Sequence, residues 1–217
     1  MKKLILGAAL SAASLLTLAS TAQAQNYQAS KAGSWLVDVR GSGIMPTAND
    51  GINTSAGAAT GLHVHVNDDY KPTLGITYFF TDHVSAELVL GTSQHDIRAQ
   101  GPGTDVLVRK TWVLPPVLTV QYRPAPASRL NPYVGAGINY MLFYSGSNEN
   151  GFKVKTPSGL GWALQAGADV ALVGPWTLNG DVKKVFFETD AKINGGALNS
   201  KVNLDPWVVS LGLGRKF

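Results

Sequence analysis

Residues 204–217 read LDPWVVSLGLGRKF, and this segment decides the fold class of the chain. Large apolar side chains recur at every second position from Trp207 to Leu213, while Ser210, Gly212 and Gly214 occupy alternate positions. An alternation with period 2 indicates a β-strand whose two faces meet different surroundings. We therefore predict a strand with one bulky apolar face and one small or polar face.

The same alternation recurs along the chain in segments of about nine to fourteen residues, longer than the five or six of an ordinary globular strand. The eight segments are 34–44, 72–80, 84–92, 111–123, 132–144, 159–172, 176–187 and 204–217. Tilted strands of about this length cross a bilayer. The sequence thus predicts an all-β fold, an eight-stranded antiparallel up-and-down transmembrane β-barrel.

The connections between these segments alternate in length. Long connections cover 45–71, 93–110, 145–158 and 188–203, and shorter ones cover 81–83, 124–131 and 173–175. Outer-membrane barrels have short periplasmic turns and long extracellular loops. We therefore expect a bacterial outer-membrane location with both termini in the periplasm, and we expect the long connections to be solvated loops rich in Gly, Asn, Asp and Ser.

The first 24 residues differ from the rest of the chain. A basic start at Lys2 and Lys3 precedes an apolar stretch at 4–18 and a small-residue cleavage pattern at 22–24. This pattern predicts a cleaved signal peptide over 1–24 and a barrel domain over 25–217. Loss of the two lysines leaves 16 basic against 14 acidic residues, from 18 and 14 in the whole chain. Such a balance provides no basic footprint for nucleic acid.

Alternation also assigns the two faces of each strand. In the fourth segment the residues Leu118, Val120 and Tyr122 share one face, and Thr119 and Gln121 share the other. We expect the large apolar face to contact lipid. An aqueous lipocalin-like barrel, with its apolar residues inside, is the alternative, but the charged residues mostly lie opposite the large apolar ones.

The predicted inward face changes character along the barrel. Near the short turns it is polar, and we expect paired charges there to plug the lumen: Asp38, Arg40, Glu87, Gln121, Gln165, Asp169, Asp181 and Lys183. Near the long connections it is apolar, which predicts a pocket open to the outside: Val89, Val113, Val117, Met141, Phe143, Val185 and Phe187. Packing of these apolar residues against the loops is the alternative.

Two adjacent prolines interrupt the fourth segment within Leu114-Pro115-Pro116. Proline cannot donate to a strand ladder, and a closed barrel offers it no free edge. We expect either an opening in the barrel wall beside the apolar pocket or a bulge that relieves curvature.

The sequence favours a protein without catalytic activity, cofactor or metal. The chain has no cysteine, which excludes disulfide frameworks and thiolate metal sites. His63 and His65 are close to Asp68 and Asp69, but this spacing is a weak metal signal. No nucleophile, base and acid stand in a recognisable order, and charge pairing explains the inward carboxylates.

Several motifs resemble the outer membrane protein W family of Gram-negative bacteria. They are Leu114-Pro115-Pro116 with Gln121-Tyr122, NPYVGAGINY at 131–140, GWALQAGAD at 161–169, DPW at 205–207 and GLGRKF at 212–217. The similarity runs over the mature chain and is most specific in the last four strands. The first long connection and residues 151–159 depart from the family pattern.

The resemblance implies passive uptake of small hydrophobic molecules. In that family the ligand enters between extracellular loops, the polar lower lumen blocks passage, and the ligand leaves sideways into the membrane beside a proline of the fourth strand. The alternating Leu211 and Leu213 with the terminal Phe217 resemble the signal read by the barrel assembly machinery. The expected partners are outer-membrane lipid, small hydrophobic solutes and that machinery.

Two other functions are compatible with the sequence. One is a closed structural, adhesion or receptor barrel whose long loops bind partners. The other is a membrane-embedded enzyme acting on lipid, for which His63, His65 and His95 have no evident nucleophile. A cavity among Met141 and Phe143 would favour the channel over the closed barrel.

Overall fold

The computed structural model describes residues 27–217, so the predicted signal peptide lies outside the described residues. They form one 15-stranded antiparallel sheet and a short 3-10 turn at Asn194–Gly196. No helix among them is both long and apolar enough to cross a membrane. The strands are β1 (Trp35–Met45), β2 (Gly51–Thr54), β3 (Ala59–Val66), β4 (Asp69–Phe79), β5 (Val84–Gly91), β6 (Ser93–Gly101), β7 (Thr104–Leu114), β8 (Val117–Tyr122), β9 (Leu130–Asn148), β10 (Val154–Lys155), β11 (Gly159–Ala171), β12 (Trp176–Phe186), β13 (Glu188–Ile193), β14 (Leu198–Asn203) and β15 (Trp207–Lys216).

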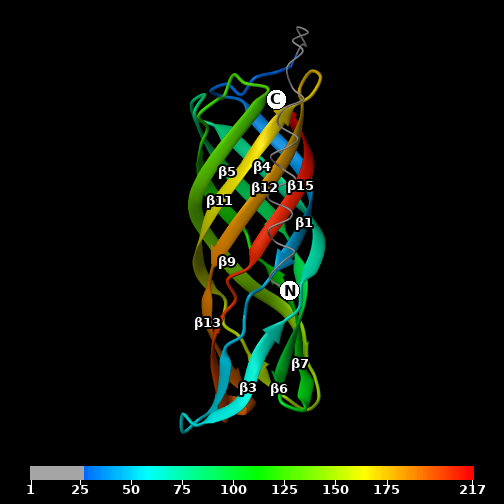
Figure 1. Ribbon diagram of the computed structural model, residues 1–217, viewed down its shortest axis with the longest axis vertical. Helices are drawn as coiled ribbons and strands as arrows, with labels where there is room; N and C mark the ends of the chain where they lie inside the picture. Colours follow the sequence, from blue (N-terminus) through cyan, green and yellow to red (C-terminus); the bar gives the residue numbers. More distant parts are fainter. Residues whose placement is uncertain (1–26) are drawn as a thin grey trace.

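The sheet closes into the predicted barrel. The closed ring runs β1, β4, β5, β8, β9, β11, β12 and β15, and β15 returns to β1 with pairs from Leu36↔Lys216 to Met45↔Trp207. The expected eight-stranded antiparallel fold is thereby confirmed, and Figure 1 shows its tilted strands around one axis. Closure pairs every strand of the ring on both sides, as a bilayer requires, except at the two prolines described below.

The outer surface of the ring carries large apolar side chains. Strands β8 and β15 expose the members of the alternating sets that we expected to face lipid: Leu118, Val120, Tyr122, Trp207, Val209, Leu211 and Leu213. Aromatic residues lie at both ends of this band, with Trp35 and Trp176 at the end that holds the chain's C-terminus and Trp162 and Trp207 at the other. This arrangement is typical of the aromatic girdles of a transmembrane barrel.

The long connections are mostly strands, so the expectation of solvated loops was wrong. Beyond the membrane band the chain continues as an extension, drawn at the bottom of Figure 1, that consists of β2, β3, β6, the start of β7, β10, β13 and β14. We call the extension the upper end of the molecule and the end that holds the C-terminus the lower end. This extension has its own apolar core: Ala48, Ile52, Val64, Val66, Ala99, Val108, Val154, Ala191, Ile193 and Val202. Frequent Gly and Asn residues hide this short alternation in the sequence.

One seam of the extension is held by side chains. Strand β7 pairs with β9, and β10 pairs with β13, but no ladder joins β9 to β10. Asn148 bridges this seam, since its Oδ1 accepts from Arg109 Nη1 (3.1 Å) and from the backbone N–H of Val154 (2.9 Å). Arg109 also donates to the carbonyl of Val154 (2.9 Å). The extension is therefore a nearly closed tube above the barrel.

The segment 111–123, predicted as one strand, is divided between β7 and β8 at Pro115 and Pro116. Neither proline has a backbone N–H, so the ladder to the preceding strands stops at this point. The division places the interruption where the barrel passes into the extension.

Candidate functional site

A network of ion pairs fills the lower lumen, at the end of the barrel that holds the C-terminus. Arg40 contacts the carboxylates of Asp38 and Glu87. Lys183 contacts Glu87 (3.0 Å) and Asp181 (2.5 Å). All of these side chains are buried, and alternation in β1, β5 and β12 points them inward. The network therefore joins three strands that are distant in sequence.

A second centre of the network surrounds Arg123. Its guanidinium donates to Asp169 (2.6 Å), Gln121 (2.8 Å) and Ser85 (3.1 Å). Asn179 and Tyr133 link this centre to the first, since Asn179 Nδ2 donates to Asp169 (2.8 Å) and to the hydroxyl of Tyr133 (2.9 Å), which in turn donates to Asp181. Gln165 donates to Glu87 (2.6 Å) and Asp181 (2.8 Å) within the first centre.

The buried charges of the lower lumen balance. Four carboxylates stand against four cations in this region, and each is at most 4% exposed: Asp38, Glu87, Asp169 and Asp181 with Arg40, Arg123, Lys183 and Lys216. Such compensation is what burial of charge requires. Arg123 and Lys216 were absent from our predicted plug, as was Tyr133, which donates to Asp181 (2.9 Å). The inward position of Arg123 in the alternation was the available signal.

Two apolar layers lie above this network. The lower one consists of Val117, Ala163 and Val185 with Val89 packed against it. The upper one consists of Val113, Met141 and Phe187 with Phe143 and Leu204 packed against it. The structure thus brings together all seven residues predicted for the apolar pocket.

A cavity of about 110 Å³ runs from these layers into the extension. Its wall includes Pro115, which we predicted at the wall opening, and six residues of the predicted pocket: Val89, Val113, Val117, Met141, Phe143 and Val185. Phe187 is buried but does not line it; its ring packs near that of Phe143, with centroids 6.2 Å apart. The extension adds apolar residues that sequence reasoning missed: Ile52, Val64, Val66, Val108, Val154, Ile193 and Val202. The period-2 spacing of Val64 and Val66 was a signal for them.

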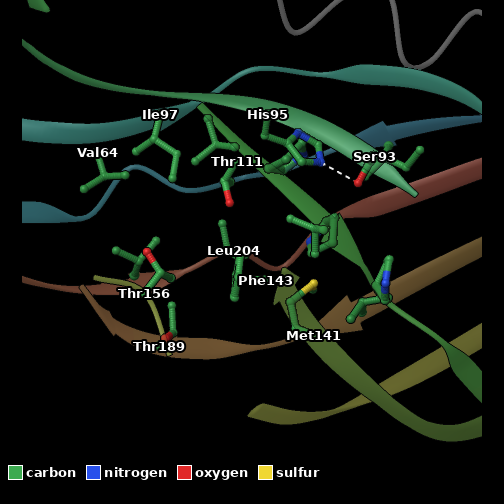
Figure 2. A pocket seen from close by; sticks show the side chains of 18 of the residues that line it. Val64, Ser93, His95, Ile97, Thr111, Met141, Phe143, Thr156, Thr189 and Leu204 are labelled. Atoms are coloured by element: carbon green, nitrogen blue, oxygen red, sulfur yellow. Dashed lines mark hydrogen bonds between the residues drawn. The ribbon is translucent and has the colours of Figure 1, made fainter. Parts of the chain in front are cut away.

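A few polar groups also line the cavity. Figure 2 shows Ser93, His95 and Thr111 on one side, Thr156 and Thr189 on the other, and Leu204 and Phe143 between them in this view. Burial lowers the pKa of His95 below its ordinary value, so its imidazole is neutral near pH 7. Apart from Arg98 and Lys183, which are paired with carboxylates, the cavity is therefore apolar with a small number of neutral hydrogen-bonding groups.

The wall beside the cavity is interrupted at the two prolines. Val89 of β5 pairs with Val117 of β8, and Ser93 of β6 pairs with Val113 of β7. Between these two pairs Gly91 lies opposite Pro115, but no backbone pairing joins them. On the other side the wall is continuous, since Tyr140 N–H donates to the carbonyl of Pro116 (3.1 Å). The interruption therefore has the junction of β5 and β6 on one side and the junction of β7 and β8 on the other.

Other predicted residues lie away from the cavity. His63 and His65 are exposed on β3, and His63 Nδ1 lies 3.2 Å from the carbonyl of Asn49. Within 27–217, no three His, Cys, Asp or Glu residues are grouped to hold a metal ion. Leu211, Leu213 and Phe217 are exposed on the outer face.

Comparisons with known proteins agree with this geometry. The model of the OmpW family matches residues 31–217. An outer-membrane protein of Sinorhizobium fredii, y4mB, is 39% identical over 95% of this chain and 90% of that protein. The dibenzothiophene metabolism operon protein PahQ of Pseudomonas aeruginosa is 27% identical over 70% of this chain and 73% of its own. The crystal structure of the outer membrane protein OprG from Pseudomonas aeruginosa superimposes with a TM-score of 0.82, at 28% identity, over 88% of this chain and 99% of that one.

Proposed function

Because the chain belongs to the OmpW family of outer-membrane barrels, we propose that it is a passive channel for small hydrophobic molecules. A solute enters the apolar cavity through the extension, is stopped by the charged network below, and leaves sideways into the membrane. The proposed function involves no covalent chemistry and no energy source.

One observation carries this proposal. Gly91 and Thr92 on one side of the wall interruption and Pro115 on the other all line the cavity. The place where the ladder is missing is therefore also a wall of the cavity, which supports a sideways exit. The cavity itself, of about 110 Å³, is comparable to one of about 150 Å³ that binds benzene in a protein core.

The lower network supports the closed floor of the channel. A neutral apolar solute that moved through the network would separate Arg40 from Asp38 and Glu87. The side chains of these three residues are at most 1% exposed. Separation of buried charges is costly, and the apolar solute supplies no compensating contact. The name of the relative PahQ, which refers to the metabolism of an apolar aromatic compound, is also consistent with such a solute.

The test replaces both prolines by residues that can complete the ladder, as Pro115→Val with Pro116→Val. We expect the double variant to lose most of its protein-dependent uptake of an apolar fluorescent solute into vesicles whose outer leaflet is lipopolysaccharide. The matched control is Pro124→Val with Pro126→Val in the turn at the opposite end of the barrel, and it should retain uptake.

Both double variants must first show the heat-resistant electrophoretic migration of a folded barrel. Equal uptake by the Pro115/Pro116 variant and the unaltered chain would exclude the sideways exit. Equal loss in both folded variants would show that the effect does not arise from the wall at Pro115 and Pro116, and it would also overturn the sideways exit.

A further inference from the structure

The cavity contains one buried hydroxyl group that has no hydrogen-bond partner among the described residues. Thr156 follows β10 and lines the cavity, and its Oγ1 is buried with no donor or acceptor within hydrogen-bond distance among residues 27–217. An unpaired buried hydroxyl costs free energy that a suitably placed polar group recovers. Thr156 therefore marks a position where a bound molecule can gain by presenting one polar atom.

Ser93, His95 and Thr111, on the opposite side of the cavity, have already used their hydrogens. His95 Nδ1 faces the carbonyl of Asn67 (2.8 Å) and must carry the hydrogen, so Nε2 accepts from the hydroxyl of Ser93 (2.9 Å). Thr111 donates to the carbonyl of Ser145 (3.2 Å). Each hydroxyl oxygen keeps lone pairs that can accept a further hydrogen bond.

Thr189 completes this set next to Thr156. Its hydroxyl donates to the carbonyl of Pro157 (3.1 Å), the residue that follows Thr156 in the chain. Figure 2 shows Thr156 and Thr189 together on the same side of the cavity. This side thus offers a free hydroxyl at Thr156 and an acceptor oxygen at Thr189, which together complement a group that both accepts and donates.

The cations that line the cavity are both occupied. Arg98 Nε donates to Asp105 (2.6 Å), and Lys183 contacts Glu87 (3.0 Å) and Asp181. A carboxylate in the cavity would have to break one of these pairs or remain uncompensated. The polar groups that remain free are neutral.

We infer that the cavity selects small apolar molecules that carry one hydroxyl group, and that Thr156 is the residue that determines this specificity. The bound alcohol accepts a hydrogen bond from Thr156 and donates to the oxygen of Thr189, while its hydrocarbon part lies among Met141, Val113 and Val185. This inference rests on the proposed function, because it names the class of solute for the same cavity.

The test compares n-hexane, 1-hexanol and hexanoate by methyl NMR of the full chain in lipid nanodiscs. Met141 lines the cavity and reports binding, whereas Met45 does not line it and serves as an internal reference. We expect 1-hexanol to bind more tightly than hexane relative to their partitioning into empty nanodiscs, and hexanoate to bind least.

Thr156→Val removes the hydroxyl at nearly constant volume, and it should lower the preference for 1-hexanol over hexane by about two- to tenfold, the value of one hydrogen bond. Thr156→Ser should keep the preference. Thr77→Val is the matched control, because its Oγ1 is also buried and unpaired among the described residues but lies outside the cavity; it should leave the preference unchanged.

The outcomes separate this inference from the proposed function. If hexane binds but 1-hexanol gains nothing over it in the unaltered chain, or if Thr156→Val leaves the ratio unchanged, the hydroxyl specificity is wrong and the channel proposal stands. Tightest binding of hexanoate also overturns the specificity. If none of the three shifts the Met141 methyl, the cavity is not a solute site and the proposed function fails as well.

Discussion

At the scale of single residues, the lower lumen depends on complete pairing of its charges. Arg123 shows this best, because its guanidinium satisfies Asp169 and Gln121 and also lies over the ring of Tyr133, 4.4 Å from its centroid. A buried charge that loses its partner is more costly than the intact pair is favourable. The network is therefore robust as a whole and sensitive at each member.

Arg123→Met should lower the free energy of unfolding by about 3–5 kcal/mol, because it leaves the carboxylate of Asp169 buried without a cation. The double variant with Asp169→Asn should lose less, since it removes both charges. Urea unfolding in phospholipid vesicles measures both values.

Arg98→Met provides the comparison, since Arg98 pairs with Asp105 (2.6 Å) at a far more exposed position. An exposed pair contributes little to stability, because solvent screens its charges. If Arg123→Met were no more destabilising than Arg98→Met, the lower network would have little role in stability.

At the scale of strands, β8 and β9 approach too closely for a side chain at Gly137. A Cβ built on this residue would lie 1.9 Å from the carbonyl oxygen of Leu118 and 2.6 Å from the Cα of Thr119. Both are backbone atoms of the neighbouring strand, so they cannot move aside without a shift of the ladder. Glycine at this position allows β8 to pair with β9, on the side of the two prolines where the wall is continuous.

Gly137→Ala should therefore lower the free energy of unfolding by about 1–3 kcal/mol through overpacking. Gly180→Ala in β12 is the control, because a Cβ at Gly180 meets nothing within 4 Å. Both are measured by the same vesicle unfolding experiment, and similar values for the two variants would argue against a steric requirement at Gly137.

At the scale of the whole molecule, the barrel closes where its first strand, β1, meets its last strand, β15. The backbone N–H of Trp35 donates to the carbonyl of Phe217 (3.1 Å), and Phe217 N–H donates to the carbonyl of Trp35 (2.9 Å). The side chain of Phe217 is 60% exposed and takes no part in these bonds. The backbone of Phe217 therefore helps to close the barrel, whereas its side chain contacts Arg215, whose guanidinium lies 5.1 Å from the ring centroid, and is otherwise exposed.

Phe217→Ala separates these two roles. We expect the variant to refold in detergent with unchanged stability, because the backbone bonds remain, but to reach the outer membrane of cells in a severalfold smaller amount. Quantitative membrane fractionation measures the second effect.

Phe80→Ala is the matched control, since Phe80 is an aromatic residue of similar exposure (58%) that follows β4. It should assemble normally. Normal assembly of Phe217→Ala would mean that its side chain is not the signal read by the assembly machinery.

The sequence alone determined the eight membrane strands, their two faces and the compartment. Alternation is a local property, because successive side chains of any strand point to opposite faces. Trp207, Val209 and Leu211 could therefore be assigned outward without knowledge of their neighbours. The same reasoning turned Asp38, Glu87 and Lys183 inward, but it could not show that they contact one another.

Only the tertiary structure decided what the inward residues meet. Pairing depends on the register between strands far apart in the chain, which local alternation does not contain. Register brings Gly91 opposite Pro115 at the wall interruption and places Thr156 in the same cavity, whereas Phe187 lies behind Phe143 and outside the lining. The strands of the extension could not be predicted for a related reason. Strands β2 and β10 have only four and two residues, which is too short for a recognisable alternation, and they are stabilised by the strands with which they pair.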